Sequence, residues 1–306
     1  MVSRDASVDE VPPGFGLPSP TMVELLYESP PVPNLAAIVN RAAERAGSPA
    51  TAIDGEQRGI SFPDHVVPIA DRPVPMTVWI LAAEPTRPAD WIEATLHQTW
   101  RWREEAAAIV PQTTASLLIT DMFAGPLERH QRLRLFHAGL AAIVEDTHPI
   151  AMRWVNGERF LEPEFYLRDL AGDPLAFEST VNVRYVTFED QPGVGLMDSV
   201  GMAAFALPDV QLHFRDLEPN WVFSKVFNVA RYLFDEGDVI EDGHTVPGLS
   251  DDDHWPCAHE WAVLGPRRMV LDINPAPHGP VRRSSGNGDD GEKRSGGLKR
   301  LFGRGL

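Results

Sequence analysis

The sequence predicts an α+β protein built from two adjoining units, each a mainly antiparallel sheet with helices packed on one face. Three observations support this class. Apolar residues make up 43% of the 306 residues, which is enough for a substantial core. Several segments alternate polar and apolar residues with the period of a half-buried strand. Other segments have the three- and four-residue spacing of amphipathic helices.

The first half opens with a strand and then a helix. Met22–Tyr27 has strand composition, and Asn34 is placed to cap a helix that Gly47 ends. Residues 65–70 and 76–83 form a predicted hairpin, because a turn containing proline separates two apolar runs. The elements expected next are a helix over 91–100, a buried strand over 115–121, a helix from Pro126 to 145, a strand over 150–155 and a short helix over 162–170.

The helix predicted from Pro126 has two distinct faces. Its apolar stripe contains Phe136 and Leu140, and Glu128 and Arg132 are expected on the opposite, polar face.

The second half gives the clearest patterns. Residues 181–185 alternate as a strand, glycines at 193 and 195 turn the chain, and residues 196–204 are predicted to return as a second strand. Residues 210–215 alternate strictly, so one face of that strand is expected to be packed and the other wet. A helix is predicted from Pro219 to Gly237, with Phe223, Phe227 and Phe234 in its broad apolar stripe. Short strands over 260–264 and 268–273 complete the second sheet.

The predicted organisation has four parts. Residues 1–20 are rich in proline, glycine and charge and are expected to be a disordered leader. Residues 21–171 form the first α+β unit and residues 172–275 the second, with a polar joint at 172–179. Residues 276–306 are expected to be a disordered basic tail. This tail contains a short basic and apolar peptide from Leu298 to Arg304. We expect either that this peptide docks transiently to a partner or that it only increases the solubility of the protein.

Charge and cysteine content exclude several classes. The net charge is −17, and the last thirty residues contribute seven basic and three acidic side chains, or +4, which leaves −21 for residues 1–276. Such a body repels phosphate backbones, so nucleic-acid binding is not expected and a cationic protein partner is favoured. The single cysteine, Cys257, forms no disulfide within the chain and suits a reducing compartment. Neither a signal peptide nor an apolar run of about 20 residues is visible, so we expect a cytoplasmic protein without stable membrane insertion.

The densest set of potential metal ligands follows the helix predicted from Pro219 to Gly237. His254, Cys257, His259 and Glu260 lie within seven residues, and in an extended segment Cys257 and His259 point to the same face, as two zinc ligands would. However, no C-x-x-C or H-E-x-x-H spacing is present, so a solvated loop entering a strand is favoured over a zinc site.

Carboxylates next to apolar runs can act as tuned acids or bases. For Asp198 and Asp209, which flank such a run, hydrogen bonds to local backbone N–H groups are favoured over a catalytic role. The motifs for a serine nucleophile, a phosphate loop and a dinucleotide site are absent. We therefore name no catalytic residue and no cofactor.

A series of motifs carries a family resemblance. These are Asn182-Val-Arg, Asp198-Ser-Val-Gly, Leu207-Pro-Asp-Val-Gln, Tyr232-Leu-Phe in the predicted helix, and Gly237-Asp-Val-Ile-x-Asp-Gly-x-Thr. Residues 181–274 resemble the bacterial proteins that carry the domain of unknown function 4261, and residues 22–170 are a weaker match to the upstream region of longer members. The resemblance implies an α+β fold with no established activity and no catalytic residues to transfer.

These observations favour a non-catalytic binding or adaptor module of the bacterial cytosol, of which a toxin-neutralising immunity protein is one special case. The alternative is a metal-assisted hydrolase with a site near Cys257, His259 and Glu260. An enzyme is the less favoured of the two classes.

Overall fold

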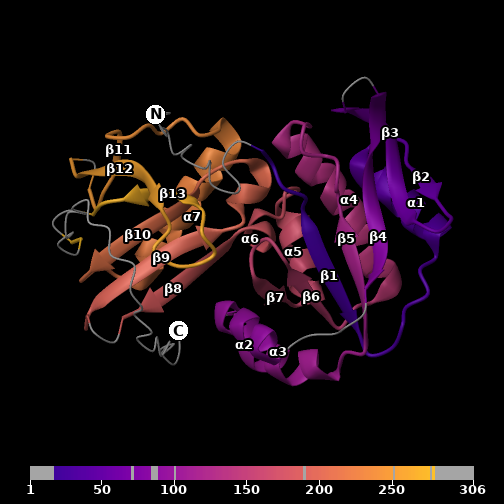
Figure 1. The fold of residues 1–306 in the computed structure, drawn as a ribbon, viewed down its shortest axis with the longest axis horizontal. Coiled ribbons are helices and arrows are strands. Elements are labelled where there is room, and N and C mark those ends of the chain that lie inside the picture. The colour runs from indigo at the N-terminus through magenta and orange to yellow at the C-terminus, as the bar shows by residue number, and fades with distance from the viewer. Residues whose placement is uncertain are drawn as a thin grey trace, which may run out of the picture. The chain divides into compact units, whose positions relative to one another are not determined.

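The structure is a computed structural model that describes residues 17–69, 72–83, 89–99, 101–188, 191–250, 252–275 and 278–279. Contacts between Cα atoms divide the chain into two compact units, whose elements are labelled in Figure 1. The first unit comprises the described residues up to 182 together with 200–207, and the second comprises 183–199 and the described residues from 208 onward. The predicted α+β class, with a mainly antiparallel sheet in each of two units, is confirmed.

The first unit is built on one seven-stranded sheet. Its strands are β1 (Met22–Tyr27), β2 (Thr51–Ile53), β3 (Arg58–Ile69), β4 (Arg72–Ala83), β5 (Ala115–Thr120), β6 (Ala151–Trp154) and β7 (Arg159–Leu161). They lie in the order β2-β3-β4-β5-β1-β6-β7, and every neighbouring pair is antiparallel. The helices are α1 (Leu35–Ala46), α2 (Ala89–Gln98), α3 (Arg103–Ile109), α4 (Arg129–Thr147), α5 (Pro163–Gly172) and α6 (Phe177–Thr180), with short 3-10 helices at Val110–Gln112 and Met202–Phe205.

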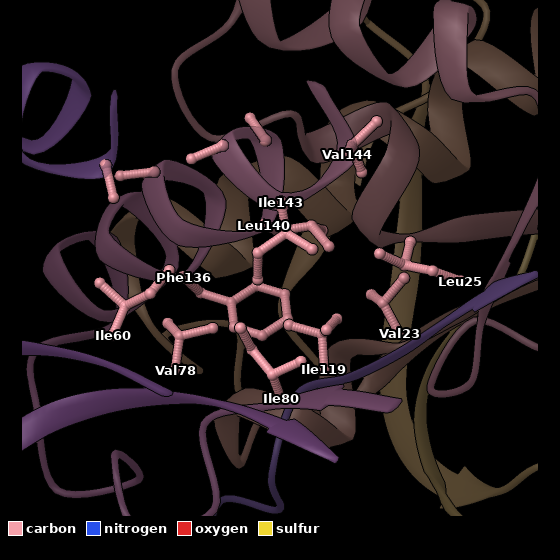
Figure 2. Packing of buried hydrophobic residues seen from close by; sticks show 14 of the residues in the cluster. Val23, Leu25, Ile60, Val78, Ile80, Ile119, Phe136, Leu140, Ile143 and Val144 are labelled. Carbon is pink, nitrogen blue, oxygen red and sulfur yellow. The ribbon is translucent and has the colours of Figure 1, made fainter. Parts of the chain in front are cut away.

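Helix α4 supplies most of the first core. Phe136 on this helix is fully buried among side chains of β4, β5 and α4, including Val78, Ile119 and Leu140 (Figure 2). Its ring meets the ring of Trp154 edge-on, with the centroids 6.2 Å apart. Gly139 lets the helix lie close to β4, because a Cβ there would come within 3.1 Å of the Val78 side chain. The predicted apolar stripe is therefore confirmed as the core face of α4.

Two details of α4 differ from the prediction. The helix begins at Arg129 and not at Pro126, because the Glu128 carboxylate accepts hydrogen bonds from the backbone N–H groups of His130 and Gln131 and caps the first turn. Arg132 was predicted to lie on the polar face, and this is wrong. It is 1% exposed, and its Nε lies 2.7 Å from the Asp121 carboxylate.

Helices lie on both faces of the first sheet, whereas packing on one face was predicted. Residues Leu25 of β1 and Met152 of β6 belong to the large core beneath α1 and α4. The adjacent strand positions, Leu26 and Ala151, face the other way and pack with Ala106 of α3 and side chains of α2. The first sheet is buried on both faces at this end because β1 and β6 carry apolar residues at consecutive positions.

The second unit contains a six-stranded sheet and one long helix. Its elements are β8 (Asn182–Thr187), β9 (Val194–Val200), β10 (Asp209–Arg215), α7 (Pro219–Glu236), β11 (Thr245–Pro247), β12 (His254–Trp261) and β13 (Met269–Ile273). The strand order is β11-β12-β13-β10-β9-β8, in which β10 and β13 are parallel and the β9/β10, β11/β12 and β12/β13 pairs are antiparallel.

Helix α7 packs on the second sheet as predicted. Pro219 occupies its first turn and Gly237, at a φ of 94°, ends it. The stripe buries Val222, Val226, Ala230, Leu233 and Phe234. Each of the valine, leucine and phenylalanine side chains contributes about 1.5–3 kcal/mol when fully buried. Two further aromatic residues, Phe223 and Phe227, are half-buried at the edge of this stripe and stack on each other with centroids 6.1 Å apart.

Several predicted segments differ from the structure. The return strand ends at Val200 and not at residue 204, because Met202–Phe205 turns into a short 3-10 helix that belongs to the first unit. Strands β2 and β7 and helix α3 were not predicted. Residues 172–179, expected as the joint between the units, lie inside the first unit, where the Asp169 carboxylate accepts hydrogen bonds from both the backbone and the hydroxyl of Ser179.

Parts of the predicted termini fall outside the described residues. These are residues 1–16 of the leader, and residues 276–277 and 280–306 of the tail, which include the peptide from Leu298 to Arg304. Within the described part of the chain, no helix combines the length and the apolar character that a membrane crossing requires.

Candidate functional site: a buried ionic network in the second unit

Four charged residues meet inside the second sheet. Asp198 lies on β9 and pairs with Gln211 of β10, while Asp209 begins β10. Arg184 lies on β8, the strand next to β9, and Arg268 directly precedes β13, the other neighbour of β10. Because the four strands are adjacent, residues that are up to 84 positions apart in the sequence (268 − 184) come into one cluster, which we call the ionic network.

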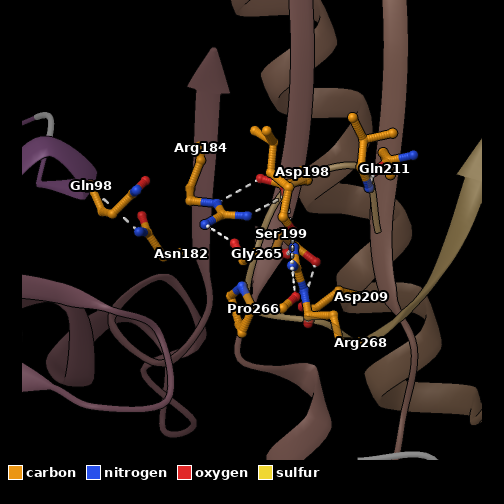
Figure 3. Close-up of polar contacts among 12 residues, drawn as sticks. Gln98, Asn182, Arg184, Asp198, Ser199, Asp209, Gln211, Gly265, Pro266 and Arg268 are labelled. Carbon is orange, nitrogen blue, oxygen red and sulfur yellow. Dashed lines mark hydrogen bonds and ion pairs between the residues drawn. The ribbon is translucent and has the colours of Figure 1, made fainter. Parts of the chain in front are cut away.

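Asp198 is the centre of the ionic network. Figure 3 shows Arg184 reaching from β8 toward this carboxylate. The Nε of Arg184 lies 2.8 Å from Oδ1 of Asp198, and its Nη2 lies 2.5 Å from Oδ2, which is the bidentate geometry of a guanidinium on a carboxylate. Arg268 donates from Nη2 to the same Oδ2 at 2.7 Å. Both side chains of the Arg184–Asp198 pair are at most 2% exposed.

Arg268 links the two carboxylates. Its Nε donates to Asp209 Oδ2 at 3.0 Å, and its Nη1 donates to the carbonyls of Leu264 and Pro266, both at 3.0 Å. Ser199 completes the cluster, since its hydroxyl donates to Asp209 Oδ1 at 2.8 Å and accepts from the backbone N–H of Val210 at 2.9 Å. The ionic network thus joins β8, β9, β10 and the loop before β13.

The ionic network is suited to cohesion and not to chemistry. Two buried arginines and two buried carboxylates balance in charge, and each carboxylate is bonded by several donors. The Ser199 hydroxyl already has both a carboxylate acceptor and a backbone donor. Asp198 and Asp209 were interpreted as groups that bind local backbone N–H groups, whereas the partners described above are side chains from other segments of the chain.

A second buried polar pair lies beside the ionic network. Gln211 donates from Nε2 to Asp272 of β13 at 2.8 Å, and its Oε1 accepts from the Val263 backbone N–H at 2.9 Å. The sequence alternation placed Gln211 on a wet face, which is wrong because the residue is 1% exposed. Asp272, the residue of the parallel neighbour β13 in register with Gln211, supplies the acceptor.

The four metal-ligand candidates all lie on β12, but their surroundings differ. His254 is exposed, Glu260 is half-buried and Cys257 is 2% exposed. Burial, followed by the charge of Asp272, raises the pKa of the Cys257 thiol to about 11, so the thiol is protonated at neutral pH. Within the part of the chain that the structure describes, no group of three or more His, Cys, Asp or Glu side chains is placed to hold a metal ion.

His259 is held by two carboxylates. Its Nδ1 lies 2.8 Å from Asp242 and its Nε2 lies 3.1 Å from Asp238, both in the loop that follows α7. Desolvation lowers the pKa of His259, but the hydrogen bonds and charges of Asp242 and Asp238 outweigh it, and the net pKa is raised. The imidazole therefore fastens this loop to β12.

Comparison with known proteins gives one result, and it concerns this unit. No curated protein and no solved structure matches the chain. Residues 198–274, which contain Asp198, Asp209 and Arg268 of the ionic network, match the family model described as a domain of unknown function, DUF4261. This match confirms the resemblance over most of the range, 181–274, in which the sequence motifs placed it.

Proposed function

We propose that the protein is a non-catalytic binding module whose partner is a basic protein. The observation that carries this proposal is the ionic network. Three charged residues of the matched domain, Asp198, Asp209 and Arg268, are buried and bonded to one another or to Arg184. Groups committed in this way stabilise the sheet and offer no free acid, base or nucleophile.

The charge of the body supports a basic partner. From Asp235 to Asp253 the sequence has eight carboxylates and no lysine or arginine. Five of them, at positions 235, 236, 238, 241 and 242, belong to exposed residues at the end of α7 and in the following loop. Tyr232 and Val239 are also 49% and 47% exposed beside them. Carboxylates around exposed aromatic and aliphatic side chains suit a partner with complementary positive charge.

The test is affinity capture from a bacterial lysate with a matched variant. In the variant, Asp235, Glu236 and Glu241 are replaced by the neutral amides Asn, Gln and Gln, which keeps the shape of the surface. We expect the unchanged protein to retain a stoichiometric basic protein at low salt, to release it as the salt concentration rises, and the variant to capture much less of it. Capture of no stoichiometric partner, or equal capture by both proteins, would count against the proposal.

The two finer alternatives lead to different tests. A toxin-neutralising role is a special case of the proposal and predicts that the captured protein is a toxin whose activity falls on binding. A metal-assisted hydrolase near Cys257, His259 and Glu260 gains no support from the contacts on β12. Elemental analysis of the purified protein tests it, because a stoichiometric transition metal would favour the hydrolase over the binding module.

A further inference from the structure

Four arginines are buried in the part of the chain that the structure describes, and one of them differs from the rest. Arg132, Arg184 and Arg268 are 1%, 3% and 4% exposed, and each donates to a buried carboxylate. Arg159 on β7 is 7% exposed. Its hydrogen bond within the described residues runs from Nη2 to the backbone carbonyl of Glu178, and its buried Nε has no partner there.

The difference is chemically large. A guanidinium has five N–H donors in a planar fork, and a buried cation without a matched acceptor is costly. Burial lowers the pKa of Arg159 to about 10, although the charges of Glu178 and Asp169 oppose the shift, so the side chain still carries its charge at neutral pH. The Glu178 carboxylate is engaged by Arg101, and the Asp169 carboxylate accepts from the Ser179 hydroxyl. Within the described residues the Arg159 guanidinium therefore has a carbonyl acceptor for Nη2 but no carboxylate partner.

A cavity lies against the Arg159 side chain. Its volume is about 200 Å³, and Arg159 is among the residues that line it. It lies at the free edge of β7, the last strand of the first sheet. Trp102, before α3, and Phe165, in α5, also line it and supply apolar surface. The Thr99 hydroxyl accepts the outward N–H of Phe160 at 2.8 Å, so this part of the strand edge is already satisfied.

The other charged groups at the cavity are paired. Arg101 bonds Glu178, and Arg168 bonds Glu162 at 3.2 Å, with both members of the second pair well exposed. Arg159 is therefore the group whose charge is left for a ligand. A cavity of this size holds a small molecule, because an apolar cavity of about 150 Å³ is large enough for benzene.

The geometry points to a binding site for a small organic acid, in which the Arg159 fork takes the carboxylate and Trp102 and Phe165 contact the apolar part of the ligand. The ligand thereby supplies the acceptor that Asp121 supplies to Arg132. Carboxylates fit a guanidinium fork with two parallel hydrogen bonds, and aromatic walls favour an aromatic or short aliphatic acid. This site is independent of the proposed basic partner, because it lies within the first unit and binds the opposite charge.

A larger cavity of the first unit is not lined by a buried arginine that lacks a carboxylate partner. Its volume is about 460 Å³, and its polar lining residues include His65 and Gln131. These two bond each other at 2.9 Å, and the other ring nitrogen of His65 lies 3.1 Å from the Ser48 hydroxyl. Arg45, also at that cavity, pairs with Glu145. No buried cation there needs an acceptor, so the smaller cavity is the stronger site.

The experiment measures binding and stability together on the full chain. Isothermal titration calorimetry and thermal melts are run with benzoate, butyrate and inorganic phosphate at constant ionic strength. The proteins are the unchanged chain, Arg159→Gln, Arg159→Lys and two controls. Arg132→Gln removes a buried arginine that has a carboxylate partner, and Arg58→Gln removes an exposed one.

We expect benzoate or butyrate to bind the unchanged chain and to raise its melting temperature with concentration. Arg159→Gln should weaken binding on the order of tenfold or more, and Arg159→Lys should recover only part of the loss because it keeps the charge but not the fork. Without ligand, Arg159→Gln should melt at or above the temperature of the unchanged chain, whereas Arg132→Gln should melt well below it. Arg58→Gln should bind and melt as the unchanged chain does.

Three results would overturn the site. The first is that neither acid binds. The second is that Arg159→Gln lowers the melting temperature as much as Arg132→Gln does, which would make Arg159 a structural residue. The third is a response to phosphate alone, which would exclude the carboxylic acid as the ligand. None of these results bears on the capture of a basic partner, so the two proposals fail separately.

Discussion

The substitution Asp198→Asn gives the sharpest test of the ionic network. Asparagine has the shape of aspartate but no charge, and it can place only one oxygen where Asp198 uses two. Three hydrogen bonds from charged donors, at 2.8, 2.5 and 2.7 Å, lose their carboxylate. The asparagine N–H₂ would also face a guanidinium donor. Arg268 keeps Asp209, but Arg184 loses its carboxylate partner and keeps the Gly265 carbonyl.

The expected cost is about 3–5 kcal/mol of the free energy of unfolding, because removing one partner leaves a buried charge without compensation. The total free energy of unfolding of a native protein is about 5–15 kcal/mol, so this loss would leave the second unit only marginally stable. Urea unfolding followed by circular dichroism measures the cost, and hydrogen exchange at β9 and β10 assigns it to the second sheet. Hydrogen exchange is needed because the two units can unfold in separate steps, which circular dichroism alone does not assign to one unit.

The matched control is Asp235→Asn on α7. Asp235 pairs with Arg231 one turn away at 3.1 Å, and both side chains are more than 30% exposed. Such a pair contributes about 0.3–0.5 kcal/mol, so its loss should be close to the error of the measurement. If Asp198→Asn cost less than about 1 kcal/mol, as a surface substitution does, the reasoning about the ionic network would be refuted.

Three further predictions follow from single contacts. Cys257 should react very slowly with a thiol reagent at pH 8 in the native state and rapidly in urea, because burial raises its pKa to about 11; fast native reaction would contradict this. The raised pKa of His259 adds stability that is complete below about pH 6.5 and is lost as the pH rises through the higher folded-state pKa. The difference in the free energy of unfolding between the unchanged chain and His259→Gln, measured by urea titration, should therefore decrease as the pH rises from 6. A difference that stays constant with pH would contradict this prediction. Phe136→Ala should destabilise the first unit by about 3–5 kcal/mol in the same assay, and Phe136→Leu by clearly less; equal effects would refute tight packing there.

The sequence predicted the elements whose patterns are long and internally consistent. Helix α7 is the best example, since Pro219, the apolar stripe and Gly237 all indicate the same boundaries. Helix α1 followed for the same reason, with its cap at Asn34 and its end at Gly47. In contrast, β7 has three residues, which is too few for any periodicity. The strand is recognised only from its pairing with β6 in the structure.

Polar residues with distant partners were the main source of error. Arg132 and Gln211 sit at positions that look exposed in a one-dimensional pattern, and both are buried because Asp121 and Asp272 accept their hydrogen bonds. The sequence motifs contained Arg184 and Asp198 but not the strand order that joins them. Arg159 had no sequence signal at all, because what distinguishes it is the missing carboxylate partner, which only the surrounding structure reveals.

The most direct test of the central claim, that the ionic network holds the second sheet together, is NMR of the arginine Nε–H groups. Arg184 and Arg268 donate these protons to buried carboxylates at 2.8 and 3.0 Å. We predict that the Nε–H signals of Arg184 and Arg268 persist at pH 8, exchange slowly with water and disappear only when the second unit unfolds. The signal of Arg132, whose Nε lies 2.7 Å from Asp121 in the first unit, is distinguished from them by the substitution Arg132→Gln. Signals that exchange as fast as those of the exposed Arg58 would contradict the account.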